Sequence, residues 1–502
     1  MKGCFVVQRR FLSVAHEVAI HLKTMGVVDE FCAYVHVRDG YNFLKEQRDI
    51  PYRSLILEED LFKQARAVEL DMEFLVKLEN DIGNLWRYIS VDRLVSHGQF
   101  LREYPYDQAR FSYEDMLRIV QTIARRIIRM LEEEKPDFVF LFQPGSLGLY
   151  LFYAIAKKRG IKIFLPDVPS IPNLAVLTEI TGRMTFAEEI FKNNLKKDTK
   201  EIAKYNEAKA YVEGFKNKPH AYSSVAGARE RQGRLAQFVF LKPSKFFYTI
   251  YFNLFRIFID WSKDPQKRTD YSTINPFWFL YDRMKRKIRN LRSQSDLYDV
   301  FDAGVSYAFF PLQHEPELQV LLHAPFNTDQ LDVAKRIARS LPVGMYLYVK
   351  DHPEMVPYRT RSYYKQLKKI PNLKLIDPSI SGFDVTKHAA LITTINSSVG
   401  WEGALIGKPI VTLGNTYYNV LSSVHFSKTP EELPGLISDA LKSGACSTDE
   451  VCRFVAALME DGVPVDLLYI WEVETDLEKK RSGLKPLADE LAKKIRQYVT
   501  RS

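Results

Sequence analysis

The stretch that decides the fold is KPDFVFLFQPGSLGLYLFYAIAKKRGIKIFL, at residues 135–165. Its residues 138–142 are purely apolar, which is typical of a strand that a parallel sheet covers on both faces. A polar turn at 143–146 follows, then an apolar helical stretch at 147–159 and a second apolar strand at 161–165. Strand, helix and strand in this order predict a doubly wound α/β sheet.

The same alternation extends outward along the chain. Short apolar strands, with helical stretches beside them, are expected at 3–7, 31–37, 306–310, 345–350, 373–376, 390–394 and 409–413. A polar and helical region is expected from residue 38 to about Leu131. We therefore predict an α/β protein with two Rossmann-like domains facing a cleft. Their expected bounds are 1–180 and 301–464, with a helical insertion at 181–300 and C-terminal helices at 465–502 that could pack back on the first domain.

Net charge, cysteine content and the length of apolar segments limit which classes of protein and of binding partner are expected. The 502 residues carry a formal net charge of +9, which favours nucleotide phosphates, acidic glycans, anionic lipid or nucleic acid as partners, or a basic surface with none. The four cysteines are scattered, which argues against a disulfide framework or a zinc site and favours reduced thiols in the cytosol. No signal peptide is expected, and no stretch reaches the roughly 18 uncharged apolar residues of a spanning helix.

Candidate site residues follow the strands of the second domain, because ligands of open α/β sheets bind outside the carboxyl ends of the strands. The loop after 306–310 offers Gln313, Glu315 and Glu317. Their amide and carboxylate groups could hydrogen-bond a ligand or act as acid or base. A solvated turn fixed by its prolines is the alternative.

The next strand, 345–350, ends in a basic loop. Lys350 is followed by Asp351, His352 and Pro353. A neutral imidazole there could donate to a phosphate oxygen, and a protonated one could stabilise a departing phosphate. Lys350 would add positive charge. His352 could equally be an ordinary loop residue.

Two serines stand at the turn that follows the strand 390–394. Ser397, Ser398 and the free N–H groups of the next helix form a potential anion site, and Glu402 lies one turn on, within reach of ribose hydroxyls. A simple helix cap is the alternative. Gly414, after the strand 409–413, would let a ligand approach the backbone, or it is a turn glycine.

As a set, three pieces of sequence resemble the capsule polysaccharide biosynthesis family, which includes the β-Kdo transferases of capsule assembly. They are FFPLQHEPE at 309–317, KDHP at 350–353 and NSSVGWEGALIGKP at 396–409. The His-Pro and Ser-Ser elements are also similar to the motifs with which bacterial GT-B sialyltransferases hold the CMP part of their donor. The resemblance covers about residues 300 to 420.

The resemblance implies a GT-B arrangement, with the nucleotide-sugar donor on the C-terminal domain and the acceptor on the N-terminal one. His352 would contact the donor phosphate, and Ser397 and Ser398 the phosphate or the cytidine. The loop from Gln313 to Glu317 would border the cleft.

On the acceptor side the candidates are Gln143, Gly145 and Ser146 at one strand end and Asp167 after the strand 161–165. A carboxylate at the cleft could be a general base for inversion or a nucleophile for double displacement. Asp167 could also be only a turn residue. No Asp-x-Asp motif is evident, so we expect no metal, and no cofactor is expected because the nucleotide-sugar is a substrate.

The predicted insertion carries an aromatic stretch, Phe238–Trp261, and a basic cluster of Arg283, Lys285, Arg286, Lys287, Arg289 and Arg292. This composition suits peripheral contact of 238–292 with a membrane or a lipid-linked acceptor. It equally suits a buried helix covered by the stems of long side chains. Nucleic acid is not expected, because no recognition motif accompanies the charge.

Taken together, these features favour a cytoplasmic glycosyltransferase, with peripheral contact on the inner face of the membrane left open. It would move a CMP-linked sugar of Kdo or nonulosonate type to a surface polysaccharide or glycolipid. The alternatives are a teichoic-acid-type glycerophosphotransferase that uses CDP-glycerol and a non-catalytic scaffold of a glycan assembly complex.

Overall fold

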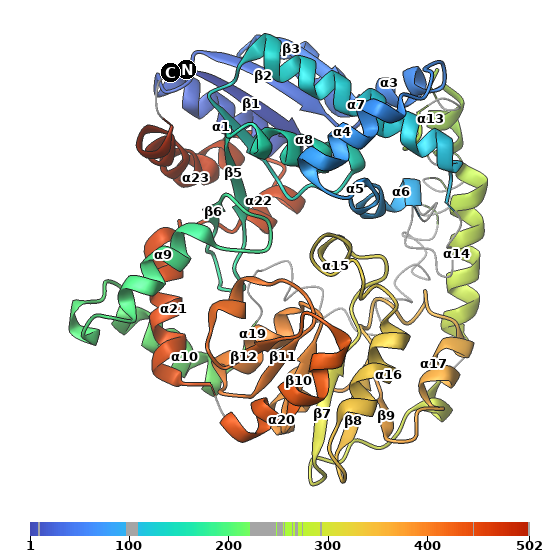
Figure 1. Ribbon diagram of the computed structural model, residues 1–502, viewed down its shortest axis with the longest axis vertical. Coiled ribbons are helices and arrows are strands. Elements are labelled where there is room, and N and C mark those ends of the chain that lie inside the picture. The colour runs from blue at the N-terminus through green and yellow to red at the C-terminus, as the bar shows by residue number, and fades with distance from the viewer. Residues whose placement is uncertain are drawn as a thin grey trace.

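The computed structural model describes residues 1–8, 11–96, 109–220, 247, 251, 255, 257–263, 265–266, 270–273, 275–291, 294–444 and 446–499. Most of the aromatic stretch Phe238–Trp261, and Arg292 of the basic cluster, lie outside these residues. Two α/β domains stand one above the other in Figure 1, with α15 (Leu318–His323) between them. α14 (Pro276–Leu291) runs along one side of the molecule.

The first sheet has six strands in the order β3-β2-β1-β4-β5-β6. All neighbours pair in parallel except β5 and β6, which are antiparallel. This is the strand order of a dinucleotide-binding fold, with the order reversing between β1 and β4. The strands are β1 (Lys2–Val7), β2 (Glu30–Val35), β3 (Tyr52–Leu57), β4 (Phe138–Leu141), β5 (Lys162–Asp167) and β6 (Val176–Thr178).

The second sheet repeats this order as β12-β11-β10-β7-β8-β9, and all of its neighbouring strands are parallel. Its strands are β7 (Tyr307–Pro311), β8 (Tyr346–Lys350), β9 (Leu373–Ile376), β10 (Leu391–Thr394), β11 (Ile410–Thr412) and β12 (Val424–Phe426). The predicted α/β class with two Rossmann-like domains is therefore confirmed.

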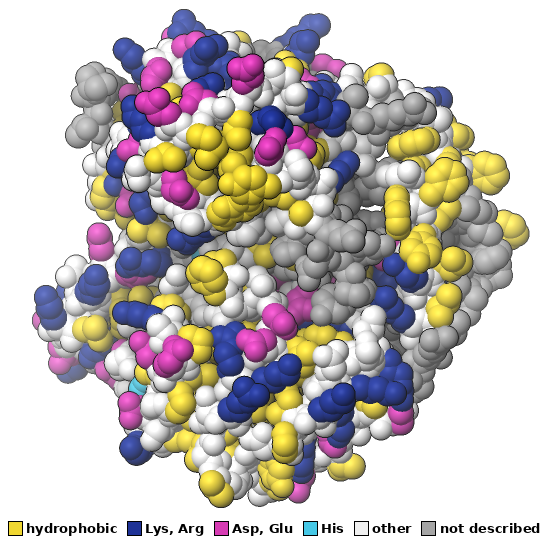
Figure 2. Space-filling view, turned by 45° about the vertical axis from the view of Figure 1, so that its right-hand side comes forward, with side chains coloured by type: hydrophobic (Ala, Val, Ile, Leu, Met, Phe, Trp, Pro, Cys, Tyr) yellow, Lys and Arg dark blue, Asp and Glu magenta, His cyan; other side chains and the backbone are white. Residues whose placement is uncertain are grey.

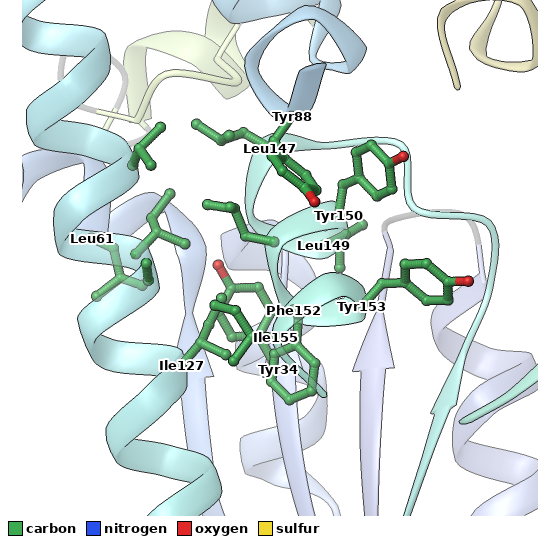
Figure 3. Close-up of a cluster of buried hydrophobic side chains, with 14 of the residues drawn as sticks. Tyr34, Leu61, Tyr88, Ile127, Leu147, Leu149, Tyr150, Phe152, Tyr153 and Ile155 are labelled. Carbon is green, nitrogen blue, oxygen red and sulfur yellow. The ribbon is translucent and has the colours of Figure 1, made fainter. Parts of the chain in front are cut away.

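Helices cover both faces of each sheet, as buried apolar strands require. In the first sheet Cys4 and Val6 pack toward one face and Phe5 and Val7 toward the other. The first face is covered by α3 (Glu58–Ala65), α4 (Met72–Ile82), α5 (Leu85–Val91), α6 (Arg93–Ser96), α7 (Tyr113–Glu134) and α8 (Leu147–Lys158). Figure 3 shows this core, where Phe152 of α8 lies against Tyr34 of β2, with the ring centroids 5.4 Å apart.

The opposite face of the first sheet is covered by α1 (Leu12–Thr24), α2 (Arg38–Glu46), α22 (Leu467–Glu472) and α23 (Leu477–Tyr498). α23, the last helix of the chain, packs along α1. Its buried side chains Leu484, Leu487 and Leu491 share a core with Phe5 of β1. The C-terminal helices therefore belong to the first domain, although the chain reaches them from the second.

The second sheet is covered on one face by α9 (Thr185–Asn194), α10 (Tyr205–Asn217), α18 (Gly382–His388), α19 (Ser398–Leu405) and α21 (Thr448–Asp461). α9 and α10 pack on α21, and Phe191 and Phe215 share the core of Tyr307. This part of the predicted insertion is thus built into the second domain. The other face carries α16 (Gln330–Ser340), α17 (Arg361–Leu367) and α20 (Leu433–Ser443). Short elements complete the chain: α13 (Ile257–Lys263), η2 (Thr199–Glu201), η5 (Ser295–Leu297), η6 (Tyr417–Val420) and η7 (Pro430–Glu432).

Four findings bear on the sequence-based expectations. The region from 38 to 131, expected to be polar and helical, also contains the strand β3, whose first residues are only partly buried at the sheet edge. Strands β6 and β12 were not expected either. All four cysteines are free and buried. Within the described ranges, none of the helices combines the length and the hydrophobicity needed to cross a membrane.

A buried acidic cluster lies where β3 ends. Glu58 is fully buried; its carboxylate accepts from Ser146 Oγ at 3.0 Å and from the backbone N–H of Gly148 at 3.1 Å. Burial, with a smaller contribution from the nearby Asp92 carboxylate, raises the pKa of Glu58 to about 8. The Tyr271 hydroxyl donates to the same carboxylate at 3.4 Å and so ties the segment before α14 to the first domain.

This cluster predicts a pH-dependent stability. The Glu58 carboxyl has an ordinary value of 4.5 in the unfolded chain and a pKa of about 8 in the folded one, so folding binds a proton between the two values. We expect the free energy of unfolding to fall as the pH rises from 4.5 to about 8. Urea titrations across this range should show a weaker pH dependence in Glu58→Gln. The exposed Glu431→Gln is the control, and an unchanged pH profile in Glu58→Gln would contradict the assignment.

Candidate functional site

A chain of hydrogen bonds joins the carboxyl ends of the two sheets. Gln143, after β4, donates to Asp167 Oδ2 at 3.2 Å and accepts from Gln319 Nε2 at 2.6 Å. Asn396 donates to the Gln319 carbonyl at 2.9 Å, and Gln313 donates to Asn396 Oδ1 at 2.9 Å. The predicted acceptor-side residues Gln143 and Asp167 therefore lie beside the predicted donor-side loop of Gln313.

A second pair of contacts fixes the loop that follows Asp167, the last residue of β5. The backbone N–H of Ser170 donates to the Tyr417 hydroxyl at 3.2 Å, and the Trp401 indole donates to the Ser170 carbonyl at 3.2 Å. Trp401 belongs to α19, the helix that begins at the serine turn. Asp167 thus stands at the junction of the two domains.

The Asp167 carboxylate is half-buried and weakly solvated. Its Oδ1 accepts from the backbone N–H of Val168 at 2.8 Å and its Oδ2 accepts from Gln143. Burial raises the pKa of Asp167, and the hydrogen bonds from Val168 and Gln143 partly offset that rise. Among the described residues, no cation contributes to the pKa shift of this carboxyl. A carboxylate in this state is more basic than one in water.

His352 lies in the loop after β8, with its side chain exposed. The backbone N–H of Glu354 donates to His352 Nδ1 at 3.2 Å. A neutral His352 therefore carries its ring proton on Nε2, which can donate to a ligand. The His314 ring stacks obliquely 4.2 Å from it, so both predicted loops contribute an imidazole to one spot. Lys350 ends β8 just before, and Pro353 is exposed just after.

A buried arginine, which the sequence did not single out, ties these two loops together. Arg359 has no exposed surface and pairs with Asp351 and, at 3.4 Å, with Glu315. It also donates to the Gln313 carbonyl at 2.8 Å. Asp351 in turn accepts from the His352 backbone N–H at 2.7 Å. The position of His352 is thus set by its neighbour Asp351, which is held by a buried ion pair with Arg359, eight residues after Asp351.

The predicted carboxylates of this loop have different surroundings. Glu315 is buried, and burial raises its pKa although Arg359 lowers it. Glu317 is half-buried and accepts from Gln313 Nε2 at 3.4 Å. Glu315 therefore serves the charge pair inside the loop, whereas Glu317 is accessible at the edge of the hydrogen-bond chain.

Removal of Arg359 should destabilise the protein strongly. Arg359→Ala would leave two buried carboxylates without their cation, which costs about 3–5 kcal/mol for a broken buried pair. Arg361→Ala is the matched control: its partner Asp296 is exposed and its own side chain is partly exposed, so little change is expected. Chemical denaturation of both variants at pH 7 measures the difference. Equal stability of the two would contradict a role for Arg359 in holding the loops.

The serine turn forms a capped helix start. Ser397 Oγ accepts from the backbone N–H of Val399 at 3.3 Å and from Thr394 Oγ1 at 2.9 Å. Tyr418 donates to the Ser397 carbonyl at 2.6 Å. Ser397 therefore caps α19, as the alternative interpretation held, while Ser398 is the first residue of the helix and half-buried. Glu402 is also half-buried, one turn further.

Three predicted positions are occupied by packing. A side chain at Gly414 would meet Ala324 Cβ at 2.8 Å, and one at Gly145 would meet Gln8 at 2.4 Å. The space beside each glycine therefore holds protein, which favours a packing role over a ligand-facing one. Ser146 is fully buried, caps α8 and is bonded to Glu58, so its hydroxyl is engaged away from solvent.

One group among the described residues could hold a metal ion. Potential ligand atoms of His314, His352 and Glu354 all lie within 4.8 Å of one another. Two imidazoles and a carboxylate suit a divalent transition ion. The sequence predicts no metal, and metal binding at these three residues would test that prediction.

Two Rossmann-like domains whose carboxyl edges meet define a GT-B-like α/β protein. Residues 266–422 match the family model described as capsule polysaccharide biosynthesis protein, which confirms the resemblance over that segment. The matched segment includes His314, His352, Arg359 and the serine turn. The first domain lies outside the matched segment.

Individual relatives are more distant. Protein FixF of Sinorhizobium fredii (strain NBRC 101917 / NGR234) is 30% identical over 132 residues, which is 26% of this chain and 31% of FixF. The chain thus spans less than a third of that relative. A structure of KpsC, β-Kdo 2,7 transferase, from Thermosulfurimonas dismutans has 12% identity and a TM-score of 0.32 over 72% of this chain and 89% of its own. UDP-GlcNAc 2-epimerase of Neisseria meningitidis has 11% identity and a TM-score of 0.28 over 92% and 98%.

Proposed function

We propose that the chain is a glycosyltransferase of capsule or cell-envelope polysaccharide biosynthesis. It would move a sugar from a nucleotide-activated donor, CMP-linked and of Kdo or nonulosonate type, to a surface polysaccharide or glycolipid. The observation that carries the proposal is the hydrogen-bond chain from Asp167 to Gln313. It brings a basic carboxylate of the first domain to the edge of the segment that matches the capsule family.

In this proposal the second domain holds the leaving nucleotide. His352 Nε2–H would donate to the donor phosphate, and Lys350 would add positive charge, as negative charge develops there. Ser398 and the start of α19 would hold the phosphate or cytidine, and Glu402 would accept from ribose hydroxyls. Ser397 would act by capping that helix.

The acceptor side of the proposal rests on Asp167. Burial, with no cation contributing from the described part of the chain, makes this carboxylate a suitable general base for the acceptor hydroxyl, or a nucleophile that forms a covalent glycosyl intermediate. Gln143 is a positioning residue, since its amide fixes Oδ2 and links it to Gln319. We expect no cofactor to take part, because the nucleotide-sugar is itself a substrate.

The test is a donor screen with the full chain. CMP-Kdo, a CMP-nonulosonate, CDP-glycerol and UDP-N-acetylglucosamine are each incubated with the protein, and released CMP, CDP-derived products and UDP are quantified. Release of CMP from a CMP-sugar supports the proposal. Turnover of CDP-glycerol alone would identify a glycerophosphotransferase, and turnover of none, with no nucleotide bound, would identify a scaffold.

A further inference from the structure

α14 has an outward apolar face that takes no part in the four hydrophobic cores of the described residues. Phe277, Tyr281, Met284 and Ile288 recur at the spacing i, i+4, i+7 and i+11, which places them on one side of a helix. Their exposed fractions are 65%, 45%, 56% and 46%. Isolated exposed apolar side chains need no explanation, but a continuous face of them does. We call these four residues the apolar face of α14.

Other exposed apolar side chains precede α14 in the chain. Phe247, Tyr251, Phe255 and Ile259 recur every four residues and are also exposed, at 72%, 60%, 58% and 43%. α13, which contains Ile259, packs beside α14 through the rings of Phe258 and Phe277, whose centroids are 5.0 Å apart. Figure 2 shows hydrophobic side chains gathered on this side of the molecule, with basic side chains close to them.

The opposite side of α14 is fixed to the second domain. Asp282 is buried and pairs with Arg286 at 2.7 Å, and Arg286 donates to the Tyr358 hydroxyl at 3.0 Å. Arg289 donates to the Tyr358 carbonyl. Because the side with Arg286 and Arg289 faces the second domain, the apolar face on the opposite side of α14 points outward. The sequence-based alternative of a buried helix concerns mainly the aromatic stretch Phe238–Trp261, most of which lies outside the described residues, so it stays a prediction.

The charge of α14 indicates what could cover this face. The helix carries five basic residues and one acidic residue, and that acid, Asp282, faces inward. At about 100° per residue, Lys285 and Lys287 fall on the two flanks of the apolar face. Lys285 Nζ lies 4.3 Å from the centre of the Tyr281 ring, and Lys287 is exposed. Burial and the nearby Arg283 and Arg286 lower the pKa of Lys287, as expected in a local excess of positive charge.

An apolar helix face with aromatic side chains and flanking lysines fits the boundary between lipid head groups and acyl chains. We propose that the apolar face of α14, with Lys285 and Lys287, binds the surface of an anionic phospholipid bilayer. The aromatic and aliphatic side chains enter the head-group layer, and the lysines contact lipid phosphates. This inference goes beyond the proposed function and does not depend on the donor.

The experiment is co-sedimentation of the full chain with vesicles of phosphatidylcholine alone or mixed with phosphatidylglycerol. We expect binding to the anionic vesicles at low salt, release at high salt, and little binding to neutral ones. Met284→Glu with Ile288→Glu should lower the partition coefficient by about 100-fold, since burial of each side chain contributes at least about tenfold. Lys285→Glu with Lys287→Glu should lower it by at least about 30-fold, because each lysine contributes about fivefold.

Val343→Glu is the matched control, because Val343 is fully exposed but lies between α16 and β8. It should bind vesicles as the parent chain does, and all variants should melt at the same temperature because the replaced side chains face outward. Three results would overturn the proposal. The first is no binding of the parent chain to anionic vesicles, and the second is unchanged binding of the Met284/Ile288 variant. The third is a dimer in sedimentation velocity that this variant converts to monomer without any vesicle binding, which would make the face a contact with a second copy.

Discussion

Asp167→Asn is expected to lower kcat by about 10²- to 10⁴-fold, the range that a positioned acid–base group contributes. The amide keeps the size of the side chain, and its single oxygen can still accept from the backbone N–H of Val168, so the fold should be retained although the hydrogen bond from Gln143 is lost. What is lost is the charge that would take the acceptor proton or attack the donor sugar. Single-turnover transfer of a CMP-sugar, with CMP release measured in parallel, gives the effect on the chemical step.

The comparison variant for this prediction is Gln143→Ala. It should produce a smaller loss of rate, because Gln143 only orients Asp167 and joins it to Gln319. Intact-mass spectrometry of a reaction quenched early separates the two roles: a covalent sugar on the parent enzyme indicates a nucleophile, and its absence indicates a base. Normal turnover by a stable Asp167→Asn would remove Asp167 from the mechanism.

His352→Ala should lower kcat by about 100-fold or more, on the scale of losing one oxyanion donor. The nucleotide gains negative charge as the sugar bond breaks, so a donor at His352 Nε2 stabilises the transition state more than the ground state. Stability should hardly change, because the side chain is exposed and the loop is held by Asp351 and Arg359. Ser398→Ala should act mainly by weakening donor binding.

His388→Ala is the control for this substitution, since His388 is an exposed histidine at the end of α18. kcat and the melting temperature are measured on the same preparations. A lower melting temperature with normal turnover in His352→Ala would make His352 a structural loop residue.

The sequence predicted most of the two sheets because their central strands are short apolar runs. Phe138 to Leu141 has four consecutive buried side chains, and nearly the same bounds were expected. β3 was not expected, because the sequence of its first residues is typical of a polar loop: Arg53 is exposed and Ser54 only partly buried. α9 could be expected as a helix, but no local pattern shows which sheet it covers.

For the site, spacing along the chain predicts which loops carry the candidate residues. It does not predict which contacts hold those loops in place. Gln143 and Asp167 come from different strand ends and meet because parallel strands end at one edge. Arg359 was not singled out, since an arginine in a polar stretch is usually exposed, and only the fold shows it inside with Asp351. The sequence suggests that Gly414 lets a ligand approach the backbone. In the structure the position requires glycine because Ala324 fills the space where a side chain would stand.

The central claim, a CMP-sugar site on the second domain, is tested most directly by nucleotide binding. The unfolding free energy of the full chain is measured with CMP, CDP, UDP and GDP, and again in His352→Ala. We expect CMP at about 100 times its Kd to raise the unfolding free energy by about 2.7 kcal/mol over the protein without nucleotide, UDP and GDP at the same concentration to raise it less, and the CMP gain to shrink in His352→Ala. Strong stabilisation by UDP or GDP with none by CMP would contradict the claim.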